Sequence, residues 1–244
     1  NLYKEKHKDT RIILEFKHKF RSAAEIYEKT RSRLEAFEME TLLFLNSIKE
    51  IKIDYENDYK IYSKTVKNYN KNRKGYFLVK LSGDVSESYL LAVRLFEIDG
   101  KQLETKVALK VRYDETGSLE LVPAAKSSKL TVFFPTNEET YMRCLIHAPF
   151  KTTPSRDNVP FNDAQNIKIT ENVGDHLKEL ISFAKEEKLL KLDFLNILPL
   201  SYSKRSSNDF YKTLFDMIKD YLKTAAVWPL EKGCYGFGLA GDCL

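Results

Sequence analysis

The 244-residue sequence predicts an α+β protein that contains an α/β lobe. Its 43% hydrophobic and 31% charged residues are typical of a globular chain that buries a core. In the middle of the chain, apolar and polar residues alternate in successive short runs, which is typical of antiparallel strands with one buried face. Nearer both ends, apolar residues recur at helical spacing. These observations predict a leading strand and helix, a β-rich portion and a lobe that ends in helices.

The N-terminal part predicts a strand followed by a helix. Between Thr10 and Phe16, apolar residues alternate with polar neighbours, which indicates a short strand. Ser22 and Glu25 have the spacing of a capping box, in which each side chain bonds a free amide at a helix start. Apolar residues then continue at helical spacing, with a break expected between positions 37 and 41: Leu34, Phe37, Thr41, Leu45 and Ile48.

Antiparallel strands joined by turns are predicted from residue 49 to residue 117. Lys49–Asp54 alternates, and a tract of Tyr, Lys and Asn from Tyr55 to Lys74 is expected to hold a strand and an exposed loop. Three further runs, the last of them followed by a turn at Asp114–Gly117, are marked by Phe77, Val79 and Leu81, by Leu91, Val93 and Leu95, and by Val107, Leu109, Val111 and Tyr113. The intervening basic residues Lys106, Lys110 and Arg112 predict a solvated face.

After residue 129 the pattern predicts short apolar strands and then long helices. Leu130–Phe134 and Met142–Ala148 are expected to be strands, the first of them ended by Pro135. A polar loop is expected at Thr152–Asp163, and a connector at Leu195–Leu200 separates two helices. The helices are marked by Val173, Leu177, Leu180, Ile181, Ala184 and Leu189, and by Phe210, Leu214, Ile218 and Leu222.

Composition and spacing exclude several classes of protein and site. The mean hydropathy is −0.43, and no apolar run approaches the ~20 residues that span a bilayer, so no membrane association is expected. Only 9 glycines are present, which weighs against glycine-rich phosphate loops. Gly236–Gly241 has the G-x-G-x-x-G spacing of a dinucleotide loop, but too few residues follow it for a helix to open there.

The cysteines and histidines predict a reduced chain without a metal site. Cys144, Cys234 and Cys243 form no C-x-x-C pair, which favours a cytoplasmic setting without disulfides or zinc. The four histidines are dispersed, and His147 is expected to be a hydrogen-bonded core or edge histidine rather than a ligand. Because the first residue is Asn and not Met, we expect the sequence to be a piece of a longer protein.

Basic residues interleave with aromatics from Tyr55 to Tyr76. Such a stretch can bind single-stranded nucleic acid through stacking and phosphate contacts. An exposed lysine-rich loop has the same composition and is the favoured interpretation.

The polar stretch Thr152–Val159 follows an expected buried strand and is a candidate anion-recognition loop. Arg156 offers a planar fork of donors to phosphate oxygens, and Thr153 and Ser155 can add hydrogen bonds. Alternatively, Arg156 pairs locally with Asp157 or Asp163, or with a helix C-terminus. Spacing alone leaves both interpretations open.

Phe133–Thr136, Ile146–Phe150 and Thr152–Val159 together resemble the middle region of sacsin-like ATPases. These proteins belong to the GHKL superfamily, named for gyrase, the heat-shock chaperone, histidine kinases and MutL. Thr10–Leu14 resembles the strand that closes their ATP-binding domain, and Leu42–Ile51 resembles the segment that enters the next domain. Later landmarks of the same proteins are similar to Leu198–Pro199, Trp228–Leu230 and Gly233–Tyr235.

The resemblance implies the part of such an ATPase that follows its ATP-binding domain. The E-x-x-x-N-x-x-D-A box, the D-x-G-x-G loop and the glycine-rich lid of that domain are absent from this sequence. ATP with Mg would therefore be held mainly by a domain outside this chain. The resemblance also implies a ribosomal-protein-like β-α-β transducer lobe whose crossover is left-handed, against the usual rule.

The resemblance further implies a role for the loop. In the family, a basic residue on a transducer loop reaches the γ-phosphate held by the preceding domain. Arg156 fits this catalytic role here, with Thr153 and Ser155 beside it in nucleotide contact, although a different loop lysine could take it. A cation from a second domain offsets the charge developing on the terminal phosphate, and it makes domain closure depend on that phosphate.

Four parts of the chain follow from the resemblance. Residues 1–20 would be the closing strand of the ATP-binding domain, and residues 21–128 a helix with the antiparallel β-rich region. Residues 129–200 would form the β-α transducer lobe, and residues 201–244 the last helix and the start of a following segment.

The expected function is that of a nucleotide-sensing coupling segment in a cytoplasmic GHKL-type ATPase. Its partners would be the preceding ATP-binding domain and a protein client or partner subunit. Two alternatives stay open: a basic nucleic-acid-binding module, and a structural protein-interaction domain in which Arg156 is an ordinary surface ion pair.

Overall fold

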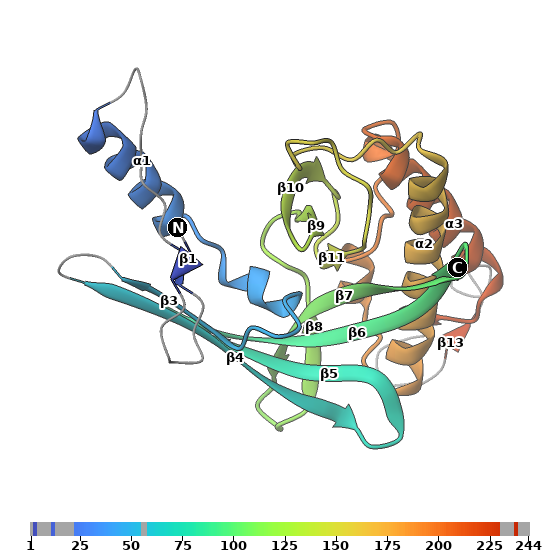
Figure 1. Ribbon diagram of the computed structural model, residues 1–244. Coiled ribbons are helices and arrows are strands. Elements are labelled where there is room, and N and C mark those ends of the chain that lie inside the picture. The colour runs from blue at the N-terminus through green and yellow to red at the C-terminus, as the bar shows by residue number, and fades with distance from the viewer. Residues whose placement is uncertain (1, 4–10, 13–21, 55–57, 230–236, 239–244) are drawn as a thin grey trace. The chain divides into compact units, whose positions relative to one another are not determined.

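The computed structural model describes residues 2–3, 11–12, 22–54, 58–229 and 237–238. The chain divides into two compact units, Asn1–Glu38 and Met39–Leu244. The larger unit contains a mixed sheet of nine strands with two long helices, which confirms the α+β class (Figure 1). The predicted boundaries at 128/129 and 200/201 both lie within this unit, and strands from both sides of residue 128 join one sheet.

The described residues of the first unit form two short strands and a helix. Strand β1 (Leu2–Tyr3) pairs antiparallel with β2 (Arg11–Ile12), and the rest of the strand predicted at 10–16 lies outside the described residues. Helix α1 (Ala23–Glu35) begins with the predicted capping box: the Glu25 amide donates to Ser22 Oγ at 3.2 Å, and the Ser22 amide donates to Glu25 Oε2 at 2.8 Å.

The helical spacing expected as far as Ile48 does not correspond to one helix. Helix α1 ends at Glu35, and the chain then forms a 3-10 helix, η1 (Met39–Leu43), at the start of the second unit. The expected break therefore separates two different elements. Ile48 lies beyond both of them, just before the first strand of the large sheet.

Strands β3 to β7 form the predicted antiparallel meander, which is confirmed. The sheet order is β10-β9-β11-β7-β6-β5-β4-β3, with β8 also paired to β7, and among the described strands only β9 and β11 pair in parallel. The strands are β3 (Glu50–Asp54), β4 (Tyr59–Asn70), β5 (Arg73–Ser82), β6 (Ser86–Ile98), β7 (Lys101–Tyr113), β8 (Leu119–Val122), β9 (Lys129–Val132), β10 (Phe134–Glu139) and β11 (Leu145–His147).

Several strand boundaries differ from the prediction. The described part of the tract, residues 58–74, forms most of a long β4–β5 hairpin with a tight turn instead of an exposed loop, and residues 55–57 lie outside the described residues. Strand β9 ends at Val132 because the chain turns at Phe133, whose φ is 63°. Pro135 does not end that strand but lies in β10, at the edge of the sheet, where proline is tolerated. The second apolar strand is shorter than predicted and covers only Leu145–His147.

Two long helices follow the last strand of this sheet, as predicted. Helix α2 (Ala164–Glu186) is capped by Asp163, and α3 (Asp209–Thr224) is capped by Asn208. The 3-10 turns η2 (Leu192–Asn196) and η3 (Tyr202–Lys204) lie between them. Within the described ranges, α2 leads to α3 rather than to another strand of the nine-stranded sheet. The β-α-β order implied by the resemblance is therefore not the order found for these elements.

The C-terminal segment is only partly described. A short pair is formed by β12 (Trp228–Pro229) and β13 (Phe237–Gly238). The other residues of the G-x-G-x-x-G stretch lie outside the described part of the chain, as do Cys234 and Cys243.

The central strands of the sheet are buried on both faces. On one face, β6 and β7 pack against α2, and Leu90, Val107 and Leu109 are at most 1% exposed (Figure 1). On the other face, η1 and Phe44 lie over β4 and β5. The prediction that Lys106 lies on a solvated face is wrong, because this covering segment leaves its side chain 3% exposed. Arg112, further along β7, is exposed.

We expect Gly75→Ala to destabilise the chain more than Gly117→Ala. Both glycines have positive φ, +83° and +79°, so each alanine carries a left-handed backbone cost of about 1 kcal/mol. A Cβ at Gly75 would also lie 2.7 Å from the Val93 carbonyl oxygen, whereas a Cβ at Gly117 would meet nothing within 4 Å. Urea unfolding should give an additional loss of at least about 1 kcal/mol for Gly75→Ala. Equal losses would contradict this close approach.

Candidate functional site

The candidate anion-recognition loop is closed upon itself and anchored at both ends. Phe150 and Val159, which flank it, are each 4% exposed and belong to the main core. The Thr153 amide donates to the Asn158 carbonyl at 3.0 Å, and the Asn158 amide donates back to Thr153 Oγ1 at 3.3 Å. Residues 153–158 therefore form a closed loop, and the residues that flank it are anchored in the core.

Arg156 lies within this closed loop and is exposed. Its φ is 61°, and its amide donates to the Thr153 carbonyl at 2.8 Å, which completes a tight turn. A non-glycine residue in this region of φ is uncommon, and such strain is frequent at functional sites. The Arg156 side chain is exposed and makes no ion pair with any carboxylate in the described ranges.

The alternative local pairing of Arg156 is not formed by the residues that the structure describes. Asp163 accepts instead from Lys151 Nζ at 3.2 Å and caps α2 through the amides of Gln165 and Asn166. Asp157 binds the rest of the fold through its backbone, because its carbonyl accepts from the Asn137 amide at 2.7 Å.

Thr153 and Ser155 act on the shape of the loop. Their hydroxyl groups lie 3.2 Å apart, and Thr153 Oγ1 also accepts the Asn158 amide. The structure thus brings the three predicted site residues together in one turn of chain. It also attaches that turn to the edge strand β10, since the Val159 amide donates to Glu138 Oε1 at 3.2 Å.

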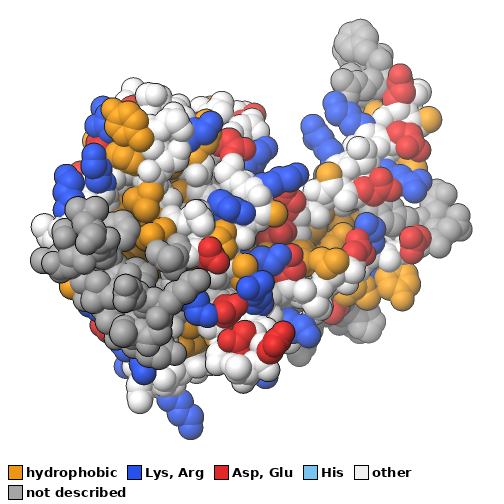
Figure 2. All heavy atoms as spheres, turned by 180° about the vertical axis from the view of Figure 1, so that it is seen from behind, with side chains coloured by type: hydrophobic (Ala, Val, Ile, Leu, Met, Phe, Trp, Pro, Cys, Tyr) orange, Lys and Arg blue, Asp and Glu red, His pale blue; other side chains and the backbone are white. Residues whose placement is uncertain are grey.

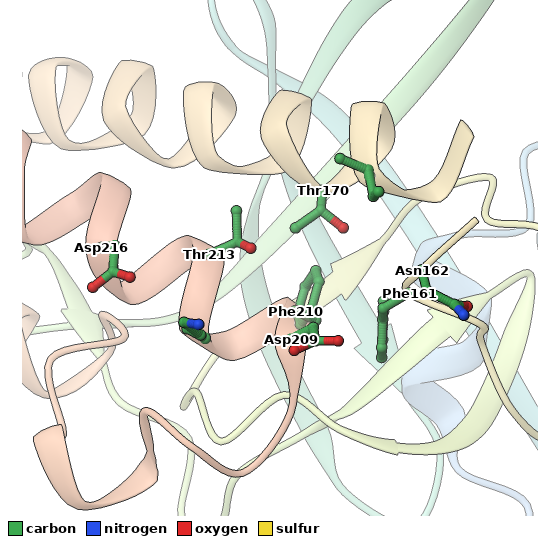
Figure 3. A pocket seen from close by; sticks show the side chains of 9 residues that line it. Phe161, Asn162, Thr170, Asp209, Phe210, Thr213 and Asp216 are labelled. Atoms are coloured by element: carbon green, nitrogen blue, oxygen red, sulfur yellow. The ribbon is translucent and has the colours of Figure 1, made fainter. Parts of the chain in front are cut away.

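A surface pocket of about 410 Å³ lies between the first turns of α2 and α3 (Figure 3). Phe161 and Phe210 stack within it at 5.4 Å, and Asp209 lies at its rim. Arg205 holds Asp216, another lining residue, through two bonds of 2.9 Å. Arg156, Thr153 and Ser155 do not line this pocket, so the predicted loop and the pocket are separate places in the fold.

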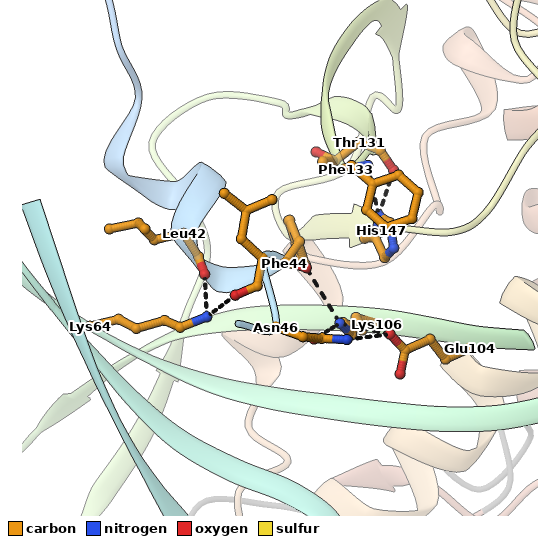
Figure 4. A network of polar contacts seen from close by, with 10 residues as sticks. Leu42, Phe44, Asn46, Lys64, Glu104, Lys106, Thr131, Phe133 and His147 are labelled. Carbon is orange, nitrogen blue, oxygen red and sulfur yellow. Dashed lines mark hydrogen bonds and ion pairs between the residues drawn. The ribbon is translucent and has the colours of Figure 1, made fainter. Parts of the chain in front are cut away.

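A polar network that the sequence analysis did not predict lies beneath η1 (Figure 4). Lys64 Nζ donates to the Leu42 carbonyl at 2.8 Å and also to the Leu45 carbonyl. Lys106 Nζ donates to Asn46 Oδ1 at 2.5 Å and pairs with Glu104 at 2.9 Å. The alternation that predicts strands cannot show that a distant segment covers these lysines.

Burial and the second lysine lower the pKa of Lys64. Burial disfavours the ammonium form, and the positive charge of Lys106 acts in the same direction. Lys64 Nζ donates to two backbone carbonyls in this buried place. Lysine near the end of a helix interacts favourably with its last carbonyls.

His147 is a buried, hydrogen-bonded histidine, as predicted. Its ring is 1% exposed and stacks on Phe44 with the ring centroids 5.4 Å apart. Nδ1 lies 3.1 Å from the Thr131 carbonyl and 3.3 Å from the Phe133 amide. Burial, and then the charge of Lys106, lowers its pKa to about 4.

The described aromatic residues of the basic tract are mostly engaged inside the fold. Tyr62 is 5% exposed, the Tyr69 hydroxyl donates to Glu187, and Tyr76 stacks on Phe183 at 3.8 Å. Tyr59 is exposed but lies under the Lys52 ammonium group. On the face of the molecule shown in Figure 2, acidic and basic side chains are intermixed. This geometry does not favour a row of free stacking surfaces for nucleic acid.

The described residues show few other candidates for chemistry. Cys144 is buried, and burial raises the pKa of its thiol to about 12. Among the residues that the structure describes, no cluster of His, Cys, Asp and Glu side chains could hold a metal ion. None of the helices in the described part of the chain has the length and apolar character needed to cross a membrane.

Comparison of the chain with family models, with curated proteins and with solved structures finds no match in any of the three.

The two buried histidines should make stability fall as the pH is lowered from 7 to 5. His176, with Nδ1 2.8 Å from Thr105 Oγ1, has its pKa lowered to about 3 by burial and then by Arg94. Unfolded imidazoles titrate near ~6.5. Below that pH the unfolded state binds protons that the folded state does not, so the free energy of unfolding decreases by on the order of 2 kcal/mol per histidine.

Urea unfolding of the chain at pH 7 and at pH 5 measures this dependence. The variant His176→Gln should depend less steeply on pH than the wild type because it removes one of the two groups. An identical slope in the variant and the wild type would contradict the assignment of His176.

Proposed function

We propose that this chain is the middle, transducer segment of a cytoplasmic GHKL-type, sacsin-like ATPase. It would sense the nucleotide γ-phosphate and couple ATP binding or hydrolysis to remodelling of a protein client or partner subunit. The observation that carries the proposal is Arg156, an exposed cation without an ion-pair partner in the described ranges, on a closed loop that the core holds at both ends.

The chain's contribution to such a reaction is positioning and charge. A guanidinium group provides a fork of donors that matches phosphate oxygens. Thr153 and its bonds to Asn158 keep the turn closed, so that little conformational entropy is lost when Arg156 makes a contact. ATP with Mg would be held mainly by the preceding ATP-binding domain, and the reactive phosphate would come from there.

The loop also supports a sensing role on physical grounds. A cation supplied by one domain to a phosphate bound on another makes closure of the two depend on that phosphate. The anchored base of the loop transmits such a contact into the main core, because Phe150 and Val159 both pack there.

Arg156→Ala should slow single-turnover ATP hydrolysis by the intact parent protein by about 10²-fold or more, with nucleotide affinity nearly unchanged. The reason is the loss of a charge contact made to the terminal phosphate in the transition state. Rapid-quench measurement at saturating ATP, with nucleotide binding measured separately, tests this expectation.

Arg112→Ala is the matched control, because Arg112 is also an exposed arginine but pairs with Glu120 on the neighbouring strand. It should hydrolyse ATP at the wild-type rate. Unchanged hydrolysis in Arg156→Ala would remove the catalytic role from this residue. It would leave Arg156 as a surface cation whose pairing is worth only ~0–1 kcal/mol.

A further inference from the structure

The larger unit begins with a segment that is attached to the sheet through its backbone as well as its side chains. The compact units divide after Glu38, so Met39–Asn46 is the first part of the larger one. Leu42, Leu43 and Phe44 are at most 2% exposed, and the segment covers the face of the sheet opposite α2.

Two lysines from different strands hold this segment. Lys64 comes from β4 and Lys106 from β7, and β5 and β6 lie between those strands in the sheet. Lys64 donates to the Leu42 and Leu45 carbonyls, while Lys106 donates to Asn46 Oδ1 and, at 3.5 Å, to the Phe44 carbonyl (Figure 4). The segment is therefore bonded to two strands that are separated by two others in the sheet.

Holding the segment with buried lysines costs free energy but fixes the position of the segment. The last carbonyls of a short helix have no donors of their own, and the lysines provide them. Burying ammonium groups, even with Glu104 paired to Lys106, stabilises less than apolar packing would. What the arrangement adds is a defined position, since carbonyl oxygens accept these bonds only when the segment lies in one place on the sheet.

The same segment contacts the strand that leads to the Arg156 loop. Phe44 stacks on His147, which is paired with Lys106 across the β7–β11 ladder. Phe150, the anchor at the base of that loop, follows His147 by three residues. A packed contact, Phe44 on His147, and three residues of chain from His147 to Phe150 therefore join Met39–Asn46 to the loop.

We propose that Met39–Asn46 is a joint that couples the chain entering the larger unit to the Arg156 loop, with Lys64 and Lys106 as the positioning residues that lock it. The meaning of this coupling rests on the proposed function, because it gives the preceding ATP-binding domain a covalent route to the loop that senses its phosphate. Because the segment contacts residues of β4, β7 and β11, a displacement at Met39 would move these three strands together.

Hydrogen exchange followed by mass spectrometry on the 244-residue chain tests the joint without nucleotide. In Lys64→Met, which keeps an unbranched side chain one atom shorter but has no donor, residues 39–48 should exchange about 10- to 100-fold faster. Residues 150–160 should also exchange faster, while α3 stays as in the wild type. Lys106→Met should give the same regional pattern.

Lys67→Met is the matched control, a lysine on the same strand whose side chain is exposed. It should leave exchange unchanged throughout. Faster exchange of 39–48 alone in Lys64→Met would overturn the coupling to the loop, and unchanged exchange there would overturn the lock. An equal increase in α3 would show that the lysines act only on global stability and would overturn the proposal as well.

If the lysine variants do not fold, Asn46→Ala decides the question. Asn46 is exposed, and its replacement removes the 2.5 Å acceptor of Lys106 without altering a core side chain. Faster exchange in both 39–48 and 150–160 supports the joint, and unchanged exchange overturns it. Because no nucleotide is used, these outcomes are independent of the hydrolysis result for Arg156→Ala, so a failure of the joint and a failure of the proposed function are distinguishable.

Discussion

The structure of the larger unit depends on burying the paired strands β6 and β7 on both of their faces. Leu90 and Leu109 lie directly opposite each other and face α2, and Leu91 and Ala108 face the other way. Each fully buried aliphatic side chain contributes about 1.5–3 kcal/mol. A sheet with both faces apolar in its centre needs two covering layers, and the chain provides them from regions far apart in sequence, α2 and Met39–Phe44.

This double burial explains where the polar groups of the core are found. Strand residues that are buried on the α2 face include Thr105, whose hydroxyl lies 2.8 Å from His176 Nδ1. On the other face, Lys64, Lys106 and His147 meet the covering segment. Each group has partners within the fold, which is required because an unsatisfied buried polar group costs about 1–3 kcal/mol. The same covering layers therefore decide both the core and its internal polar contacts.

The Arg156 loop is a consequence of the same architecture at the margin of the core. Short strands β9, β10 and β11 extend the sheet beyond β7, and the loop leaves β11 and returns to α2 with apolar anchors at both ends. Its internal hydrogen bonds replace the ladder that a strand would provide. A short polar sequence can in this way present one arginine on a defined base, while the neighbouring Lys151 and Asp163 satisfy each other.

Local sequence patterns were sufficient for the elements whose causes are local. The capping box at Ser22, the alternation of β6 and β7 and the helical spacing of α2 and α3 each reflect contacts within a few residues, and each element was found. The grouping of Thr153, Ser155 and Arg156 was also predictable, since all three lie in one short loop. The ion-pair partners around Arg156 were not predictable, because sequence spacing does not show that Asp163 pairs with Lys151.

The sequence alone determined the class of fold, the order of most elements and the identity of the polar loop, because periodicity and turn chemistry act over short distances. Only the tertiary structure decided that Lys106 is buried, that Pro135 lies in an edge strand and that α2 leads to α3 rather than to another strand of the sheet. Those features depend on which distant segment covers which face. The sequence pattern of a basic residue among alternating apolar ones is the same whether its side chain faces water or is covered by Phe44. Only the folded chain distinguishes the two cases.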